Sequence, residues 1–287
     1  MLHPRGLSFS ESLDALIATY RASSAIRPEV LFRHFLPTGY RATTLSSVAE
    51  DFQDLAILAK VHLGMIVTLY DDLADHPEHR NSELLKELYT LNVEEDRLAA
   101  VHLNEKEKVV FELGRYLFLE LTALLREFPH YRVLVAALRF DIEQFYSCNK
   151  YSELMSSFPA ICNLEESRTL GSHNMGIVAA GTIDLMASSG LHLEELGKAR
   201  EVLHLGQRLG RISNLVFTFN RELSEGDSTN EILISKDPES YRKKLLEEFS
   251  AKATEIRSHS LHTFSTQSYA EGLEELHRLH AALEGRI

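Results

Sequence analysis

Residues 55–75 read LAILAKVHLGMIVTLYDDLAD, a long apolar stretch that ends in three aspartates. Its apolar residues recur at helical spacing, which predicts an α-helix. Lys60 and His62 interrupt it, and it is short for a membrane span, so a buried core helix is favoured, with His62 as a core histidine. We therefore expect a helix from about Leu45 to Asp75 in the protein's core, closed by Pro77.

Helical periodicity continues on both sides of this stretch. Ser8 and Glu11 have the spacing of a capping box at a helix start. Further helices are expected over Glu105–Phe128, His130–Tyr151, Leu164–Ser189 and Leu193–Leu223, and from Pro238 to the end. No strand pair or βαβ rhythm is evident. The sequence therefore predicts an all-α fold, a single domain over residues 1–287 built as a bundle of roughly ten helices.

Composition excludes several classes of protein. A net charge of −12 argues against a nucleic-acid-binding protein, which would carry a basic face. Only two cysteines, Cys148 and Cys162, are present, so neither a disulfide framework nor a zinc cluster is expected. The N-terminus, Met1 to Arg5, is not followed by the apolar core of a signal peptide. A cytoplasmic protein without a membrane span is the resulting expectation.

Three carboxylates stand at the C-terminal end of the central helix. Asp71 and Asp75 are four residues apart and share a helix face, with Asp72 beside them. The helix macrodipole disfavours negative charge at this end, so a compensating cation is expected. Mg²⁺ prefers such oxygen ligands and binds through a few carboxylates together with substrate phosphates. The alternative is a solvated acidic helix end, because the pattern alone is weakly specific.

A second polar row lies downstream on an otherwise apolar helix. Asn214, Thr218 and Glu222 are spaced by four residues, so each is about 6 Å from the next along one face. All three side chains carry oxygen and suit a hard cation. The alternative is a polar seam packed against another helix. Both motifs together are more specific than either one.

With these two motifs the chain resembles the class I terpene synthase family, in its bacterial form. Asp71, Asp72 and Asp75 look like the aspartate-rich motif of that family, and Asn214, Thr218 and Glu222 look like its metal triad. The resemblance implies the family's helical fold around a central apolar cavity. It also implies Mg²⁺, three ions per active site, with Mn²⁺ as a substitute. The implied metal ligands are Asp71, Asp75, Asn214, Thr218 and Glu222.

The resemblance extends to residues that would grip a diphosphate. Arg168 stands where the family has its diphosphate-sensing arginine, followed by Gly171 and Ser172 in the segment where a helix breaks beside the substrate. Arg221 holds the usual basic position next to the triad. Two departures are that Leu215 replaces an aspartate, and that no Arg-Tyr pair follows residue 222. The resemblance leaves Tyr269 to stand in for the tyrosine, and Arg221 or Arg208 for the arginine.

The implied reaction is ionisation of a prenyl diphosphate, followed by carbocation cyclisation or rearrangement and release of diphosphate. A C20 substrate is favoured slightly over C15, with a bicyclic diterpenyl diphosphate as one form, and a homodimer is left open. Aromatic faces stabilise carbocations by cation–π contact. The candidate aromatic residues are Phe52, Phe140, Phe145, Phe217 and Tyr146.

Two other functions compete with the cyclase. A chain-elongating prenyltransferase of the same fold would carry a second aspartate-rich motif where this chain has Asn214, Thr218 and Glu222. A non-catalytic helical binding or scaffold protein would place both polar rows in solvent or in structural contacts.

Overall fold

A computed structural model describes residues 6–23, 26–76, 78–225, 229–284 and 286. Pro77 and the segment Met1 to Arg5 lie outside the described residues. One described helical stretch, Glu50–Ala74, is long and apolar enough to cross a membrane by length and composition alone. In its most apolar window 72% of the residues are buried inside the protein, as in a core helix. The predicted buried central helix is therefore confirmed.

The described chain is helical and contains no strand, only an isolated bridge between Val48 and Ser188. The first α-helices are α1 (Phe9–Ser23), α2 (Leu36–Thr43), α3 (Gln53–Ala74), α4 (Ser82–Leu88), α5 (Glu105–Leu125) and α6 (Tyr131–Ser157). The others are α7 (Leu164–Leu170), α8 (Ile177–Met186), α9 (Leu196–Glu225), α10 (Glu231–Ile234), α11 (Pro238–Ser258) and α12 (Thr266–Ala282). The all-α prediction is confirmed.

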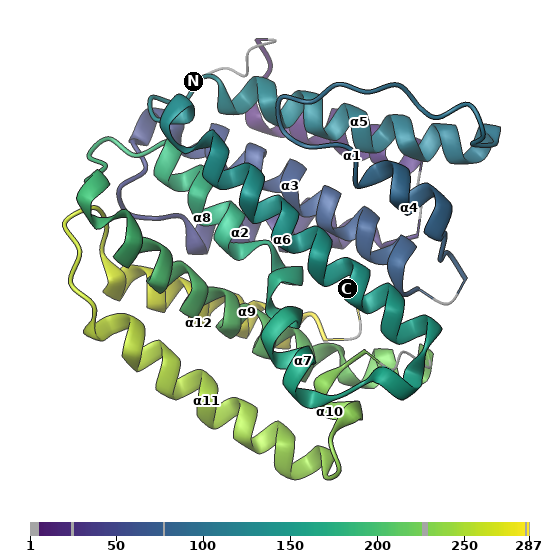
Figure 1. Ribbon diagram of the computed structural model, residues 1–287. Coiled ribbons are helices and arrows are strands. Elements are labelled where there is room, and N and C mark those ends of the chain that lie inside the picture. The colour runs from purple at the N-terminus through teal and green to yellow at the C-terminus, as the bar shows by residue number, and fades with distance from the viewer. Residues whose placement is uncertain (1–5, 24–25, 77, 226–228, 285, 287) are drawn as a thin grey trace.

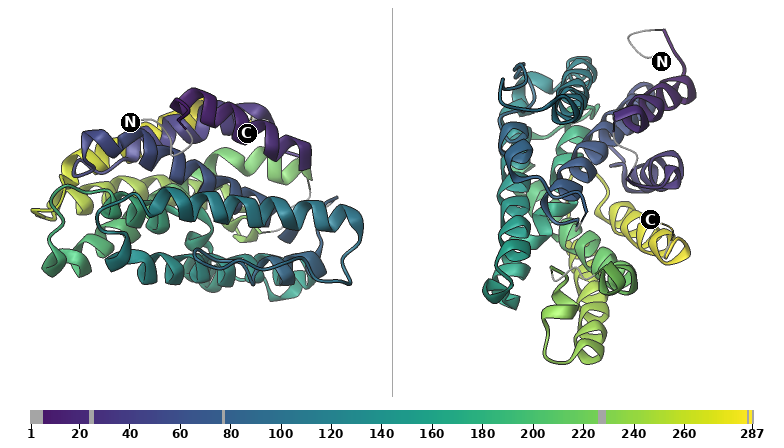
Figure 2. Two further views of the ribbon diagram at one scale, coloured as in Figure 1. Left: turned by 90° about the horizontal axis from the view of Figure 1, so that it is seen from above. Right: turned by 90° about the vertical axis from the view of Figure 1, so that its right-hand side faces the viewer.

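Helix α3 is the core of the bundle. It packs against α1, α2, α4, α5, α6 and α8 (Figure 1). In the right-hand view of Figure 2, the teal helices α5 and α6 form one side of the molecule, and the purple α1 and yellow α12 lie on the other. Helix α9 packs against α8, α11 and α12. The bundle therefore places the ends of α3 and α9, which carry the two polar motifs, around shared interior space.

Local sequence signals explain several helix boundaries. The Ser8 hydroxyl accepts from the Glu11 N–H at 3.4 Å, and the Glu11 carboxylate accepts from the Ser8 N–H at 2.9 Å, which is the predicted capping box. The central helix is shorter than expected, because residues 44–49 form no helix and α3 starts at Gln53.

The expected helix over Leu164–Ser189 is broken in the middle. Helix α7 ends at Leu170, a 3₁₀ turn covers Gly171–Met175, and Gly176 adopts a left-handed φ of 61° before α8 begins. Residues with a Cβ rarely adopt this φ, so glycine is required at that position. The predicted helix break is present, and it turns the chain beside the end of α3.

Candidate active site

One cavity is lined by residues from both polar motifs. Asp71 and Asp75 reach it from the end of α3, while Asn214, Thr218 and Glu222 reach it from α9. Further parts of the wall come from α2, the turn after α7, α8 and α12. Five oxygen-bearing side chains from two helices therefore line one cavity.

Two of the cavity carboxylates, Asp71 and Glu222, accept hydrogen bonds from asparagine amides. The Asn174 amide, in the turn between α7 and α8, donates to Asp71 Oδ1 at 2.5 Å. Asn230, the N-cap of α10, donates to Glu222 Oε2 at 2.7 Å. On α9, the Thr218 hydroxyl donates to the Asn214 carbonyl at 2.7 Å, one turn back. These bonds orient the oxygens without burying them away from the cavity.

Asp72 has a different environment from its two neighbours. It is fully buried and does not line the cavity. Arg27 forms an ion pair with its Oδ1 at 2.7 Å. Burial raises the pKa of the Asp72 carboxyl to about 6, although the charge of Arg27 lowers it. The structure thus separates the motif into two cavity carboxylates and one that anchors Arg27, itself part of the cavity wall.

A cation missed by the sequence reasoning lines the cavity one turn before the triad. Arg211 is buried, and its Nη1 donates to Asn214 Oδ1 at 3.3 Å. Its Nε lies 3.9 Å from Glu231 and has no hydrogen-bond partner among the described residues. A Cβ on Gly171 would lie 3.5 Å from the Arg211 guanidinium, so the broken helix backs directly onto this side chain. In the sequence, the signal that could have revealed Arg211 was its position three residues before Asn214.

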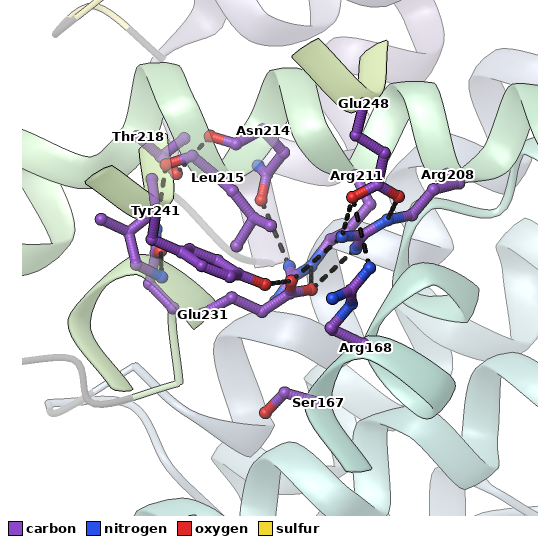
Figure 3. A network of polar contacts seen from close by, with 12 residues as sticks. Ser167, Arg168, Arg208, Arg211, Asn214, Leu215, Thr218, Glu231, Tyr241 and Glu248 are labelled. Carbon is purple, nitrogen blue, oxygen red and sulfur yellow. Dashed lines mark hydrogen bonds and ion pairs between the residues drawn. The ribbon is translucent and has the colours of Figure 1, made fainter. Parts of the chain in front are cut away.

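Arg168 and Arg208 belong to an ion-pair network beside the cavity (Figure 3). The Arg208 guanidinium binds Glu231 at 2.9 Å and Glu248 at 2.8 Å. Arg168 lies 3.4 Å from Glu248, with 49% of its side chain exposed. Neither arginine is among the residues that line the cavity, whereas Arg221 is. The cavity cations are therefore Arg27, Arg211 and Arg221, together with a lysine at the inner end.

That inner end holds a buried ion pair. Lys60 Nζ lies 2.7 Å from Asp184 Oδ1, and both side chains are at most 2% exposed. The ammonium also donates to the Thr44 hydroxyl at 2.8 Å, and the Leu45 N–H donates to Asp184 Oδ2 at 3.1 Å. Lys60 lies 11 residues before Asp71, about 16 Å along α3. The cavity therefore has a charged group at each end.

Tyr269 also lies toward the inner end. Its hydroxyl would touch a Cβ on Gly206, at 2.3 Å, and has no hydrogen-bond partner among the described residues. Gly206 precedes Asn214 by eight residues, about 12 Å along α9. Burial raises the Tyr269 pKa, so the group is a neutral phenol. Tyr269 therefore faces the interior of the cavity, away from the metal motifs. The missing Arg-Tyr pair would act at the metal motifs, so Tyr269 does not lie where its tyrosine is expected.

The aromatic candidates lie outside the cavity wall. Phe52 is half-buried at the start of α3, and Phe140 is 53% exposed on α6. Phe145 and Tyr146 pack together in the core, with ring centroids 5.8 Å apart. Phe217 packs behind α9 against α12. The aromatic wall is formed instead by Phe35, Tyr40 and Tyr269. Helical spacing in the sequence could not tell which apolar face would meet the hollow.

The residues at the cavity mouth fit a metal–diphosphate ligand better than a metal alone. No group of three or more His, Cys, Asp or Glu residues with metal-binding geometry occurs in the part of the chain that the structure describes. Asn174 Oδ1 and Arg211 Nε are nevertheless buried in the cavity wall without a partner there. A free amide oxygen and a free guanidinium N–H in one cavity wall suit a ligand that carries both positive metal and negative phosphate oxygens. Ser172 Oγ is also buried and unpaired, although it does not line the cavity.

Solved structures share this architecture at low sequence identity. No family model matches the chain, and no curated protein matches it. The fold is shared with solved structures of a plant isoprene synthase. The isoprene synthase of grey poplar leaves (Populus x canescens), in complex with three Mg²⁺ ions and dimethylallyl-S-thiolodiphosphate, aligns with a TM-score of 0.67 at 11% identity. The alignment covers 95% of this chain and 53% of that one.

A second structure of the same poplar enzyme gives a TM-score of 0.66, also at 11% identity, over 95% of this chain and 52% of that chain. This chain therefore spans about half the length of the structures it matches. At this identity the likeness establishes the fold, so the chemistry has to be argued from the cavity.

Proposed function

We propose that this protein is a class I terpene synthase of the bacterial type, which ionises a prenyl diphosphate and converts the carbocation into a terpene. The observation that carries the proposal is the convergence of Asp71 and Asp75 with Asn214, Thr218 and Glu222 on one cavity. A structural role in a scaffold protein would not require two separate rows of oxygen ligands to line the same interior cavity. The poplar enzyme of the same fold binds Mg²⁺ and a diphosphate analogue.

Under this proposal Mg²⁺ is held by those five residues, and when bound it supplies Lewis-acid stabilisation of the diphosphate leaving group. Arg211 and Arg221 offer fixed positive charge to the diphosphate oxygens at the same end. Arg168 reaches them only if it leaves Glu248. Apolar side chains of the wall, among them Leu36, Val67 and Ile177, would shield the carbocation from water. The prenyl chain extends from the mouth toward Lys60 and Asp184.

The substrate length stays a prediction. C20 diphosphates, linear or bicyclic, are favoured over C15, and the chain-elongating prenyltransferase remains the nearest alternative. A panel of C5, C10, C15, C20 and bicyclic C20 diphosphates, incubated with Mg²⁺, separates these functions. Mass spectrometry of the organic extract and a diphosphate-release assay are the readouts. A longer diphosphate formed only with added isopentenyl diphosphate would indicate the prenyltransferase.

Matched variants on α9 test the role of the triad. Glu222→Gln removes a cavity carboxylate, and Glu201→Gln removes an exposed carboxylate from the same helix. Product formation should disappear in Glu222→Gln and persist in Glu201→Gln, with helical circular dichroism unchanged in both. Wild-type protein should also gain ~2.7 kcal/mol of stability with Mg²⁺ and inorganic diphosphate at a hundred-fold excess over Kd. Equal activity of the two variants would refute the assignment.

A further inference from the structure

A histidine in the cavity wall has no role in the binding of metal or diphosphate described above. His280 lies in the last turn of α12 and is 6% exposed. It lines the cavity together with Leu276, one turn earlier on the same helix. The imidazole is thus a buried titratable group in the cavity wall.

The His280 ring has an unused nitrogen. Its Nδ1 is buried and has no hydrogen-bond partner among the described residues. Burial, together with the nearby His277 and Arg221, lowers the pKa of His280 to about 4. The ring is therefore neutral near pH 7, and a neutral imidazole carries one nitrogen lone pair that can accept a proton. A buried polar nitrogen without a partner is uncommon in folded proteins, and a catalytic role is one explanation for it.

Its neighbours place His280 near the reacting end of the cavity. Its ring centroid is 4.6 Å from that of Phe35 and 6.3 Å from that of Phe217. Phe217 directly precedes Thr218 of the triad, and Arg221 is close enough to influence the imidazole pKa. The histidine thus lies at the level of the triad, between an aromatic cavity residue and α9.

We propose that His280 is the base that ends the reaction by taking a proton from the carbocation. This inference rests on the proposed function. In the step, a C–H bond next to the cationic carbon breaks, and its electron pair forms the new C=C bond. The proton goes to the His280 lone pair, giving an imidazolium. When the olefin leaves, the imidazolium returns that proton to the released diphosphate, so the protein ends unchanged.

Three polar groups deeper in the cavity are less suited to this step. The Lys60 ammonium and the Asp184 carboxylate already neutralise each other at the inner end. Tyr269 is a neutral phenol with a raised pKa, which makes it a poor proton acceptor. His280 combines a neutral base, an unpaired ring nitrogen and aromatic neighbours in Phe35 and Phe217.

Helix α12 also provides a matched control. His277 lies one turn before His280, and its pKa is likewise lowered by burial. It differs in two respects: its Nδ1 lies 2.7 Å from the Ser213 hydroxyl, and it does not line the cavity. His280→Phe and His277→Phe therefore make the same chemical change on one helix, inside and outside the cavity.

The test measures olefin formed per diphosphate released, with the substrate that wild-type protein turns over. We expect this ratio to fall ~10²-fold in His280→Phe, with alcohols from water capture replacing the olefin. His277→Phe should keep the wild-type ratio. His280→Gln, which keeps a polar side chain, repeats the test if the phenylalanine variant does not fold.

An unchanged ratio in folded His280 variants would overturn the inference, even if total turnover fell, and would leave the proposed function standing. A wild-type product consisting only of alcohols would overturn it as well. Absence of diphosphate release from wild-type protein, with every substrate, would overturn the proposed function and this inference with it.

Discussion

The buried ion pair at the inner end of the cavity predicts a large effect from a single substitution. Lys60→Met keeps the length of the side chain and removes its charge, leaving the Asp184 carboxylate buried without its cation. Removing one partner of a buried pair costs about 3–5 kcal/mol. For a domain of this size, 1 kcal/mol shifts Tm by about 2–4 °C. The variant should therefore melt about 6–20 °C below wild type.

The penalty should depend on pH. Burial raises the pKa of Asp184, and in wild type the charge of Lys60 opposes that rise. Without Lys60 the folded-state pKa lies further above the unfolded value. A carboxyl of this kind favours folding when protonated, and the stability it contributes is lost as pH rises through the folded pKa. Lys60→Met should therefore lose more stability at pH 8 than at pH 5.

Thermal and urea unfolding of a double-mutant cycle measures the coupling. Lys60→Met/Asp184→Leu removes both charges, so its loss should be about 1–3 kcal/mol smaller than the sum of the two single losses. Part of the loss remains, because the Leu45 N–H loses its acceptor and the Thr44 hydroxyl loses the hydrogen bond donated by Lys60. Additive losses, or a Lys60→Met penalty below about 1 kcal/mol at both pH values, would show that the pair is not a strong buried interaction.

Three further outcomes follow from the geometry. Arg211→Met should lower kcat/KM by ~10²-fold or more in a steady-state assay, since it removes a cavity cation. A larger loss in Arg168→Met would show that Arg168, and not Arg211, is the more important arginine for the diphosphate. Gly272→Ala should lower Tm, because its Cβ would lie 2.0 Å from the Ala42 carbonyl oxygen where α12 meets α2; a Tm within 1 °C of wild type would contradict the close approach. Chelation with EDTA should stop turnover, and added Mg²⁺ should restore it; turnover that persists in EDTA would contradict the metal assignment.

Much of the fold could be predicted because apolar periodicity records burial. The stretch over residues 55–75 gave the core helix, and Gly171 with Gly176 marked the break before α8. Asn214, Thr218 and Glu222 were placed on one face by spacing alone, and that face meets the cavity. Local geometry sufficed for these features because each lies within one helix.

The remaining site depends on packing between helices, which spacing does not encode. Arg27 is 45 residues from its partner Asp72, and Lys60 is 124 residues from Asp184. Neither pairing has a local signal in the sequence. His280 was one of fourteen histidines without ligand spacing, and only the packing of α12 against α9 reveals its place in the wall. Cavity residues contributed by distant segments need the three-dimensional structure.

The most direct test of the central claim is to locate the metal. Crystals grown with Mn²⁺ and inorganic diphosphate, measured at the manganese absorption edge, would reveal the ions by anomalous scattering. We expect peaks at the cavity mouth between Asp71 and the row of Asn214, Thr218 and Glu222, with the diphosphate extending toward Arg211. Ions only on the outer surface, or diphosphate bound away from this mouth, would contradict the account.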